Sequence, residues 1–392
     1  MKRLVLVAVS LAGCKGKPEK RAIASDAALA RVADAGVIDA GPWPELANLP
    51  SVEPVRVIEL PARPDVPRFT VGGPVLLGDL AIVSSSQFGF IAADFRRGQI
   101  AWTKAAGSHL AAPLVVDGNA VLIGDCINPP QVSESDRLLG CMRIVTPAGA
   151  DQAYIAIRGK QKAVADFAGA TGEERVWAAK KNVVWRRGEH AIAIDLMTGI
   201  AAPTTAEDPP LVVTYKQKTW QIRQDDEGVI TAKGQPAWHT ERSYGPLLGA
   251  VYLPEQAPMV RAASATRRSG KPEILLFDMD ATGSLHGQVS LYPAPGIGII
   301  GHAISVVGDV ALAVRLDKTL QRDYIAGYAA NALLIWTYAL PYMVRPDPVG
   351  IAIASDAVVV FHDGDTLTIL PEVSAPPTAP GAVRVPSENA TP

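Results

Sequence analysis

The side chains of this 392-residue chain that could do chemistry are few and widely spaced. The histidines stand alone, without the HxH, HxxxH or HExxH spacing that brings imidazoles together on a metal ion. Neither a GxSxG turn nor a Walker A loop accompanies them. We therefore predict that the chain is not an enzyme and holds no metal or cofactor. The six histidines are His109, His190, His239, His286, His302 and His362.

Three short motifs have part of a ligand-binding pattern. In 278–283 oxygen-bearing side chains fall at the first, third and fifth positions of a calcium loop, but the twelfth position is Val289, where a bidentate Glu is needed. The sequence HDGD at 362–365 is typical of a hairpin turn. The glycines of 296–301 have the spacing of a nucleotide loop, but no strand-to-helix pattern surrounds them. We expect none of the three to bind a ligand.

The N-terminal segment carries the one clear processing signal. Lys2 and Arg3 precede an apolar run at 4–12, which is too short to span a bilayer and typical of a signal peptide. The run ends in Leu-Ala-Gly-Cys at Cys14, which resembles the lipobox of bacterial lipoproteins. The resemblance implies removal of the signal peptide 1–13 and a diacylglyceryl group on the Cys14 thiol. The alternative is an ordinary signal peptide with an incidental cysteine.

Charge and composition limit the partners and the location. The net charge is −2, and loss of Lys2 and Arg3 would make it more negative, so we expect no nucleic-acid partner. Residues 14–50 are rich in small and charged side chains and predict a flexible tether behind the lipid. Lys15 directly after the modified cysteine favours the outer membrane, on its periplasmic face or on the cell surface, if the source is Gram-negative.

With Cys14 assigned to the lipid, Cys126 and Cys141 remain. They flank a Pro-containing loop between two strand-like runs, which predicts a disulfide at the base of a long hairpin loop in an oxidising compartment. Two reduced, buried thiols are the alternative. A metal site is less favoured because no histidine lies beside them at ligand spacing.

Between 51 and 370 the pattern is all-β. Short runs rich in Val, Ile, Trp and Tyr alternate with Gly, Asp, Asn and Pro, and helical periodicity is almost absent. Residues 74–106 divide into four strands, at 74–77, 80–85, 88–93 and 99–103, which is the content of one propeller blade. Similar units recur every 40–50 residues or so, which predicts a β-propeller of about seven, possibly eight, four-stranded blades. The Pro-rich residues 371–392 predict a disordered tail.

The best-preserved units share an aspartate at the end of a hydrophobic strand, a Thr-Gly turn and a following tryptophan. They resemble the PQQ-like β-propeller repeat. The aspartate should accept hydrogen bonds from the turn amides, the glycine should supply a positive φ, and the tryptophan should pack between blades. We expect these residues to stabilise the repeat and not to bind a ligand. They are Asp94, Gly98, Trp102, Asp195, Thr198, Gly199, Asp278, Thr282 and Gly283.

The resemblance also frames two functional expectations. Quinoprotein dehydrogenases with this repeat use vicinal cysteines, which this chain lacks, so quinone catalysis is not expected. A lipid-anchored propeller is similar to the propeller lipoproteins of the outer-membrane barrel-assembly machinery, which implies a scaffold that binds envelope proteins. The alternative is a ligand sensor or an enzyme that uses the central channel. We place the binding surface on rim loops, at 128–138 and 261–271.

Closure of the ring requires one more strand. The last unit, 349–370, supplies only three strand-like runs, at 349–353, 357–361 and 366–370. The segment 55–60 is the nearest unused strand-like run, and pairing it with the last unit would cover an open sheet edge. We therefore predict that 55–60 completes the last blade.

Overall fold

The computed structural model describes residues 38–39, 51–61 and 72–374, the last range with gaps. The gaps are 108, 130, 173, 180, 206–210, 216–217, 225–228, 233–237, 240–243, 254–258, 269–270, 281–284, 292–297, 306–307, 316–322, 330–333 and 341–348. Cys14, Thr282 and Gly283, together with most of the expected tether and tail, lie outside the described residues.

The described residues form seven sheets, here called blades 1 to 7, each built around three or four consecutive antiparallel strands. Blade 1 contains β3 (Val75–Leu77), β4 (Leu80–Ser85), β5 (Gly89–Asp94) and β6 (Gln99–Lys104). Blade 2 contains β7 (Leu114–Val116), β8 (Asn119–Gly124), β9 (Asp136–Val145) and β10 (Asp151–Lys160). Blade 3 contains β11 (Glu174–Ala179), β12 (Asn182–Arg187), β13 (His190–Asp195) and β14 (Ala201–Thr204).

The remaining blades follow the same order. Blade 4 contains β15 (Leu211–Tyr215), β16 (Lys218–Gln224), β17 (Val229–Ala232) and β18 (Trp238–His239). Blade 5 contains β19 (Tyr244–Leu253), β20 (Met259–Arg268), β21 (Lys271–Asp280) and β22 (Leu285–Leu291). Blade 6 contains β23 (Gly298–Ile304), β24 (Val310–Arg315), β25 (Asp323–Tyr328) and β26 (Leu334–Ala339). Blade 7 contains β27 (Gly350–Ile353), β28 (Ala357–His362), β29 (Thr366–Pro371) and β2 (Arg56–Glu59).

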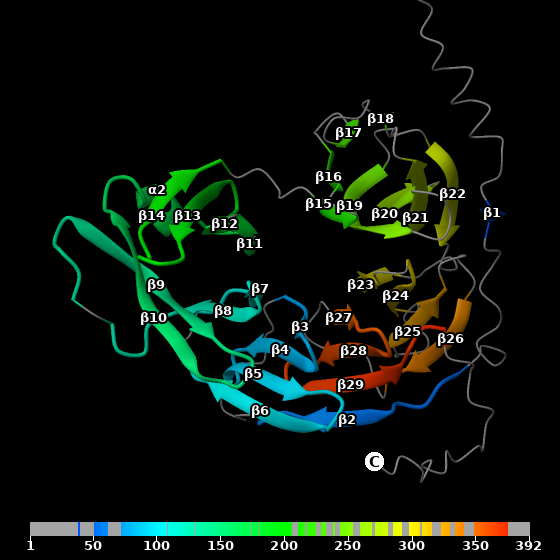
Figure 1. Ribbon diagram of the computed structural model, residues 1–392, viewed down its shortest axis with the longest axis horizontal. Helices are drawn as coiled ribbons and strands as arrows, with labels where there is room; N and C mark the ends of the chain where they lie inside the picture. Colours follow the sequence, from blue (N-terminus) through cyan, green and yellow to red (C-terminus); the bar gives the residue numbers. More distant parts are fainter. Residues whose placement is uncertain are drawn as a thin grey trace, which may run out of the picture.

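The blades lie around a common centre, with the first strand of each blade innermost (Figure 1). Inner strands of successive blades contact one another, as β3 does with β7 and β7 with β11. Blade 7 contacts blade 1 where Gly73, just before β3, packs on Gly350 of β27. The architecture is therefore a seven-bladed β-propeller, as the recurrence of the sequence units predicts.

Ring closure by the N-terminal strand is confirmed. Strand β2 pairs antiparallel with β29, with Arg56 opposite Ile369 and Glu59 opposite Thr366. Ile58 and Leu60 enter an apolar cluster that contains residues of both blade 7 and blade 1. First and last blades are thus joined by backbone pairing and by a shared core.

Two middle strands, β4 and β28, are buried along almost their whole length. Every residue of β28 is buried, and so is nearly every residue of β4. A blade is covered on both faces by its neighbours, so both sets of alternating side chains leave water. This explains why the sequence shows continuous Val- and Ile-rich runs in place of strict polar–apolar alternation.

The structure departs from the sequence-based expectations in four places. Strands β9 and β10 have 10 residues each and make a longer hairpin than the repeat predicts. A five-residue helix, α2 (Ala165–Gly169), follows them. Within the expected tether, β1 (Ile38–Asp39) pairs with β22 and adds a fifth strand to blade 5. The boundary at 371 is slightly early, because Pro371 ends β29 and Val373 is buried in the core.

Candidate binding site

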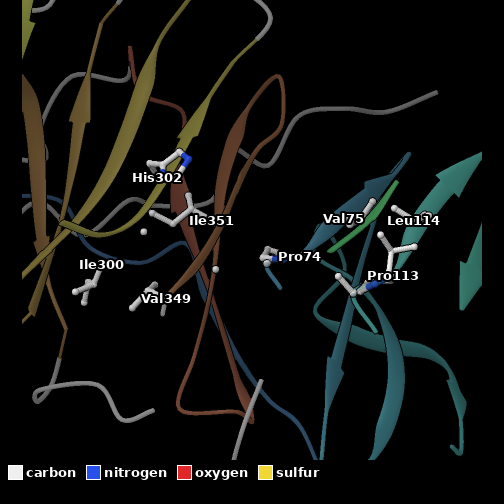
Figure 2. Close-up of a pocket in the computed structure, with 13 residues that line it drawn as sticks. Pro74, Val75, Pro113, Leu114, Ile300, His302, Val349 and Ile351 are labelled. Carbon is white, nitrogen blue, oxygen red and sulfur yellow. The ribbon is translucent and has the colours of Figure 1, made fainter. Parts of the chain in front are cut away.

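A central cavity of about 810 Å³ lies among the inner strands. Its walls are backbone, proline rings and aliphatic side chains of blades 1, 2, 3, 6 and 7 (Figure 2). His302 of β23 is the only titratable side chain among the described lining residues, and burial lowers the pKa of its imidazole. The cavity therefore presents a neutral, mostly apolar surface at neutral pH. The lining residues are Gly73, Pro74, Val75, Ala112, Pro113, Leu114, Val176, Ile300, Gly301, His302, Val349, Gly350 and Ile351.

A polar cluster lies where blades 2 and 3 meet. Arg187 ends β12 opposite Glu174, which begins β11, and the Arg187 Nε lies 2.6 Å from the Glu174 Oε1. His109, in the link from blade 1 to blade 2, places its Nε2 3.0 Å from the same oxygen. Arg187 also stacks over the rings of Trp185 and Phe167, 4.4 and 5.0 Å from their centroids. We call His109, Glu174 and Arg187 the junction trio.

The trio is partly removed from water. Side-chain exposure is 15% for Arg187 and 18% for Glu174. Burial alone would raise the pKa of the Glu174 carboxyl, but His109, Arg187 and the indole N–H of Trp185 together hold it below its usual range. The carboxylate therefore stays charged and fixes two side chains from different parts of the chain.

A disulfide joins the two strand-flanking cysteines near this junction. Cys126 follows β8 and Cys141 lies in β9, with their Cα atoms 4.9 Å apart. The bond closes the base of the loop that connects the two strands. Asp125, beside the bridge, accepts the backbone N–H of His109 on its carboxylate at 2.9 Å. The bridge is thus connected to the link that carries the junction trio's imidazole.

Next to the bridge, blade 2 exposes two large side chains. Ile127 is 45% exposed and Tyr154 of β10 is 42% exposed. They are adjacent, because the Ile127 N–H donates to the Tyr154 hydroxyl at 3.3 Å. The Arg143 guanidinium lies 4.4 Å from the Tyr154 ring centroid and is braced by Asp151 at 2.9 Å. We call Ile127 and Tyr154 the hairpin patch.

The repeat aspartates bond to their own turns. Asp195 ends β13, and its Oδ1 accepts the backbone N–H groups of Met197 and Thr198 and the Thr198 hydroxyl. These bonds, the Thr198 hydroxyl first, hold the pKa of Asp195 below its usual range. Gly199 follows with φ 70°, and a Cβ there would lie 2.2 Å from the carbonyl oxygen of Ala156. Both the turn and its close approach to blade 2 therefore require glycine.

The same turn recurs in blade 1, with a tryptophan after it. Asp94 accepts the Arg97 N–H at 2.8 Å, and Gly98 has φ 75°. Trp102 packs in a cluster that contains residues of blades 1 and 2, and its indole N–H donates to the Pro147 carbonyl at 3.2 Å. Asp278 lies in β21 beside Arg261 and Gly287 on neighbouring strands. Among the described repeat residues, those of blade 1 and those of blade 3 thus belong to separate turns and do not form a common site.

A second polar group is buried in blade 7. The His362 Nδ1 lies 2.5 Å from Asp363, and its Nε2 lies 2.9 Å from the Thr368 hydroxyl. The order Asp–His–Thr is that of a nucleophile relay, but Thr368 is only 1% exposed. The three side chains therefore lock the β28–β29 hairpin. Asp363 and Gly364 both have positive φ, as expected for the predicted hairpin turn.

Further observations concern metal ligands, membrane-spanning helices and the expected rim loops. Among the described residues no three histidine, cysteine or acidic side chains come close enough to hold a metal ion. In that same part of the chain no helix has the length and apolarity to cross a membrane. The prediction of a loop at 261–271 was wrong, because most of these residues lie in β20 and β21. The loop expected at 128–138 does precede and enter β9, beside the hairpin patch.

The junction trio was not predicted from the sequence. His109 was counted only as an isolated histidine, and it lies 78 residues from Arg187 along the chain. The available signal was two adjacent arginines at the end of an apolar strand, Arg186 and Arg187, where a charged side chain needs a partner to leave water. No sequence signal identified that partner.

Comparisons with known proteins give distant structural likenesses. No family model matches the sequence, and no curated protein matches it. BamB from Moraxella catarrhalis is similar at 11% identity over 81% of this chain and 97% of that chain, with a TM-score of 0.44. Quinohemoprotein alcohol dehydrogenase from Comamonas testosteroni is similar at 11% identity over 87% of this chain and 79% of that chain, with a TM-score of 0.40. The C-terminal WD40 domain of Sif2 is similar at 9% identity over 82% of this chain and 99% of that chain, with a TM-score of 0.41. The β-propeller assignment rests on the sheet order of this chain itself, and its function is argued from its own residues.

Proposed function

We propose that this protein is a lipid-anchored binding module of the bacterial envelope, attached to the outer membrane through Cys14, that recognises another envelope protein through the hairpin patch. The observation that carries the proposal is the pair of adjacent exposed side chains in blade 2, Ile127 of the β8–β9 loop and Tyr154 of the lengthened β9–β10 hairpin. Tyrosine is among the residues that contribute most to protein interfaces.

The hairpin patch is held in place before any partner arrives. The Tyr154 ring is stacked by Arg143, and the Ile127 backbone is tied to the Tyr154 hydroxyl. The disulfide fixes the chain on the N-terminal side of Ile127. Side chains that are already ordered lose little conformational entropy on binding, which favours recognition by this surface.

The lipid anchor supports the same role. Acyl chains on Cys14 would confine the propeller to a membrane surface, where membrane-associated partners are concentrated. Labelling with an alkyne fatty acid should mark the wild-type protein and not the Cys14→Ser variant. Label retained in the serine variant would remove the anchor from the proposal without affecting the hairpin patch.

Capture of partners from solubilised envelope tests the binding surface. Tagged wild type should retain a defined envelope protein, and Tyr154→Asp or Ile127→Asp should lose most of it at equal abundance of folded bait. Ile100→Asp is the matched control, because Ile100 is also exposed and apolar but lies on blade 1. Equal capture by all three variants would refute the hairpin patch as the binding surface.

The central cavity supports a second candidate, a sensor for a small uncharged ligand. Its apolar walls and neutral His302 suit such a ligand better than an ion. Native mass spectrometry of the purified protein should then show a bound small molecule that His302→Arg excludes. A spectrum of unliganded protein after incubation with envelope extract would argue against this candidate.

A further inference from the structure

The hairpin patch belongs to a longer row of exposed side chains on one face of the β9–β10 hairpin. Tyr154, Arg158 and Lys160 are exposed along β10, the outermost strand of blade 2, while Ile157 and Gly159 are buried. Alternate residues of a strand point to the same side, so the exposed ones form one row, with Tyr154 and Arg158 about 13 Å apart. The row lies at the outer edge of the ring (Figure 1).

A first charged group lies beside Tyr154. Asp151 begins β10, and its two carboxylate oxygens lie 2.9 Å from the Arg143 guanidinium and 2.9 Å from the Lys104 ammonium. Arg143 also stacks on the Tyr154 ring. Lys104 ends β6 of blade 1, so the group crosses the seam between blades 1 and 2. Two cations share one carboxylate here, which leaves an excess of positive charge next to the hairpin patch.

A second charged group lies at the other end of the row. Lys160 is opposite Asp136 in the β9–β10 ladder, and its Nζ lies 2.6 Å from the Asp136 Oδ1. The Lys160 ammonium first, and with it Ser135 and Arg158, holds the pKa of the Asp136 carboxyl below its usual range. Two cations again share one carboxylate, and the Lys160 side chain is 71% exposed. Positive charge therefore lies on both sides of the hairpin patch.

This positive charge is a local property of the hairpin. The whole chain has a net charge of −2, whereas residues 136–160 contain four basic and two acidic side chains, a difference of +2. A surface of this sign favours a partner with carboxylates and disfavours a basic one. The exposed apolar pair between the two charged groups further favours a polypeptide, since a polymer of phosphates offers no apolar side chain at that place. The charged side chains of 136–160 are Arg137, Arg143, Arg158 and Lys160 against Asp136 and Asp151.

We propose that the hairpin patch binds an acidic polypeptide segment of its partner. An apolar side chain of that segment contacts Ile127 and Tyr154, and carboxylates before and after it meet the charged groups around Asp151 and Asp136. The inference rests on the proposed binding role and specifies the chemistry of the partner. Exposed charges at the rim of an interface act mainly on the association rate and on specificity, so binding should weaken as salt is added.

Photo-cross-linking of the full chain in the envelope identifies the segment. Gln152 is exposed on β10, two residues before Tyr154 and therefore on the same side, and p-benzoylphenylalanine in its place should cross-link to peptides of net negative charge. The same replacement of Gln99, exposed on β6 of blade 1, is the control and should not. Cross-links to neutral or basic peptides, or to a phosphate-rich glycolipid, would overturn this inference and keep the hairpin patch as a binding surface. Absence of any product from position 152 would refute both.

Reversal of one charge tests the complementarity. Affinity for the cross-linked partner, measured at 50 mM salt, should fall about fivefold in Arg158→Glu, because an exposed ion pair is replaced by repulsion. Lys160 still pairs with Asp136 in this variant, so the unfolding midpoint should stay unchanged. Lys181→Glu, at an exposed position of blade 3, is the matched control and should bind like the wild type. At 500 mM salt the difference should disappear. Equal affinity of Arg158→Glu and wild type at 50 mM salt would overturn the inference.

Discussion

The seams between blades 7 and 1 and between blades 2 and 3 both join parts of the chain that are distant in sequence, and they use charge differently. At the first seam, Arg96 binds Asp79 of blade 1 and Asp356 of blade 7, each at 2.6 Å. These side chains are about half exposed, with Arg96 at 46%. At the second seam, Arg187 and Glu174 of the junction trio are only 15% and 18% exposed.

Apolar burial dominates the first seam. Strand β2 adds Ile58 and Leu60 to a core shared by blades 7 and 1, and its backbone completes the sheet. Water screens the exposed ion pairs of Arg96, so they add little to the stability of this seam. Closure of the ring is therefore a matter of strand pairing and hydrophobic contact.

The stability of the second seam depends on its charges much more than that of the first seam does. Removing one partner of a partly buried pair leaves the other charge without compensation, which costs more than the pair itself contributes. The same low exposure makes the arrangement sensitive to protonation. Comparison of the two seams indicates that an ion pair contributes to the stability of a blade junction according to how deeply it is buried.

The largest effect should come from removing the closing strand. Deletion of 51–61 takes Val52, Ile58 and Leu60 from the core, at about 1.5–3 kcal/mol for each buried large side chain, and exposes the edge of β29. We expect loss of the cooperative unfolding transition, measured by denaturant titration. Deletion of 15–37 is the control and should leave the transition in place. A normal transition in the first variant would mean that the ring closes without β2.

Opening the disulfide should have the next largest effect. Closing a loop of about 15 residues stabilises by about 3 kcal/mol in the chain-entropy model. Cys126→Ser with Cys141→Ser should lower the free energy of unfolding by about that amount and should raise hydrogen exchange in 105–111 through Asp125. Peptide mapping without reductant should show the linked peptide in the wild type. Two free thiols in folded protein from an oxidising compartment would contradict the predicted bridge.

A charge deletion at each seam tests the comparison directly. Arg187→Met should cost about 1–3 kcal/mol, because Glu174 then keeps a charge in a partly buried site. Arg96→Met is the matched variant, and its effect on the unfolding midpoint should be within experimental error. Equal effects of the two substitutions would show that burial does not separate the seams.

The smallest effect is the contribution of the second seam to the pH dependence of stability. The pKa of Glu174 is lower in the folded protein than its ordinary value of about 4.3, so the folded state resists its protonation more than the unfolded state does. The contribution of Glu174 to folding stability is complete at pH values above its ordinary pKa. It is lost as the pH falls through the lowered pKa of the folded state. Denaturant titrations from pH 6 to pH 3 should show a shallower loss of stability in Glu174→Gln. Parallel curves for variant and wild type would contradict this assignment.

Much of the fold could be predicted from local patterns. The strands expected at 80–85, 357–361 and 366–370 lie within one residue of β4, β28 and β29, because buried runs bounded by turn residues mark strand ends. The closing role of 55–60 followed from counting strands in the last unit. The 10-residue strands β9 and β10 were not predicted, because their length depends on the neighbouring blade against which they extend.

By itself, the sequence determined the repeat, the turn residues of blades 1 and 3 and the strand that closes the ring. Each depends on residues near one another in the chain or on the number of similar units. Only the tertiary structure decided that His109 meets Glu174 and Arg187 and that Ile127 lies beside Tyr154. These contacts follow from the rotation of each blade relative to the next, which brings a link from one blade against the strand ends of another. No local pattern of residues encodes that rotation.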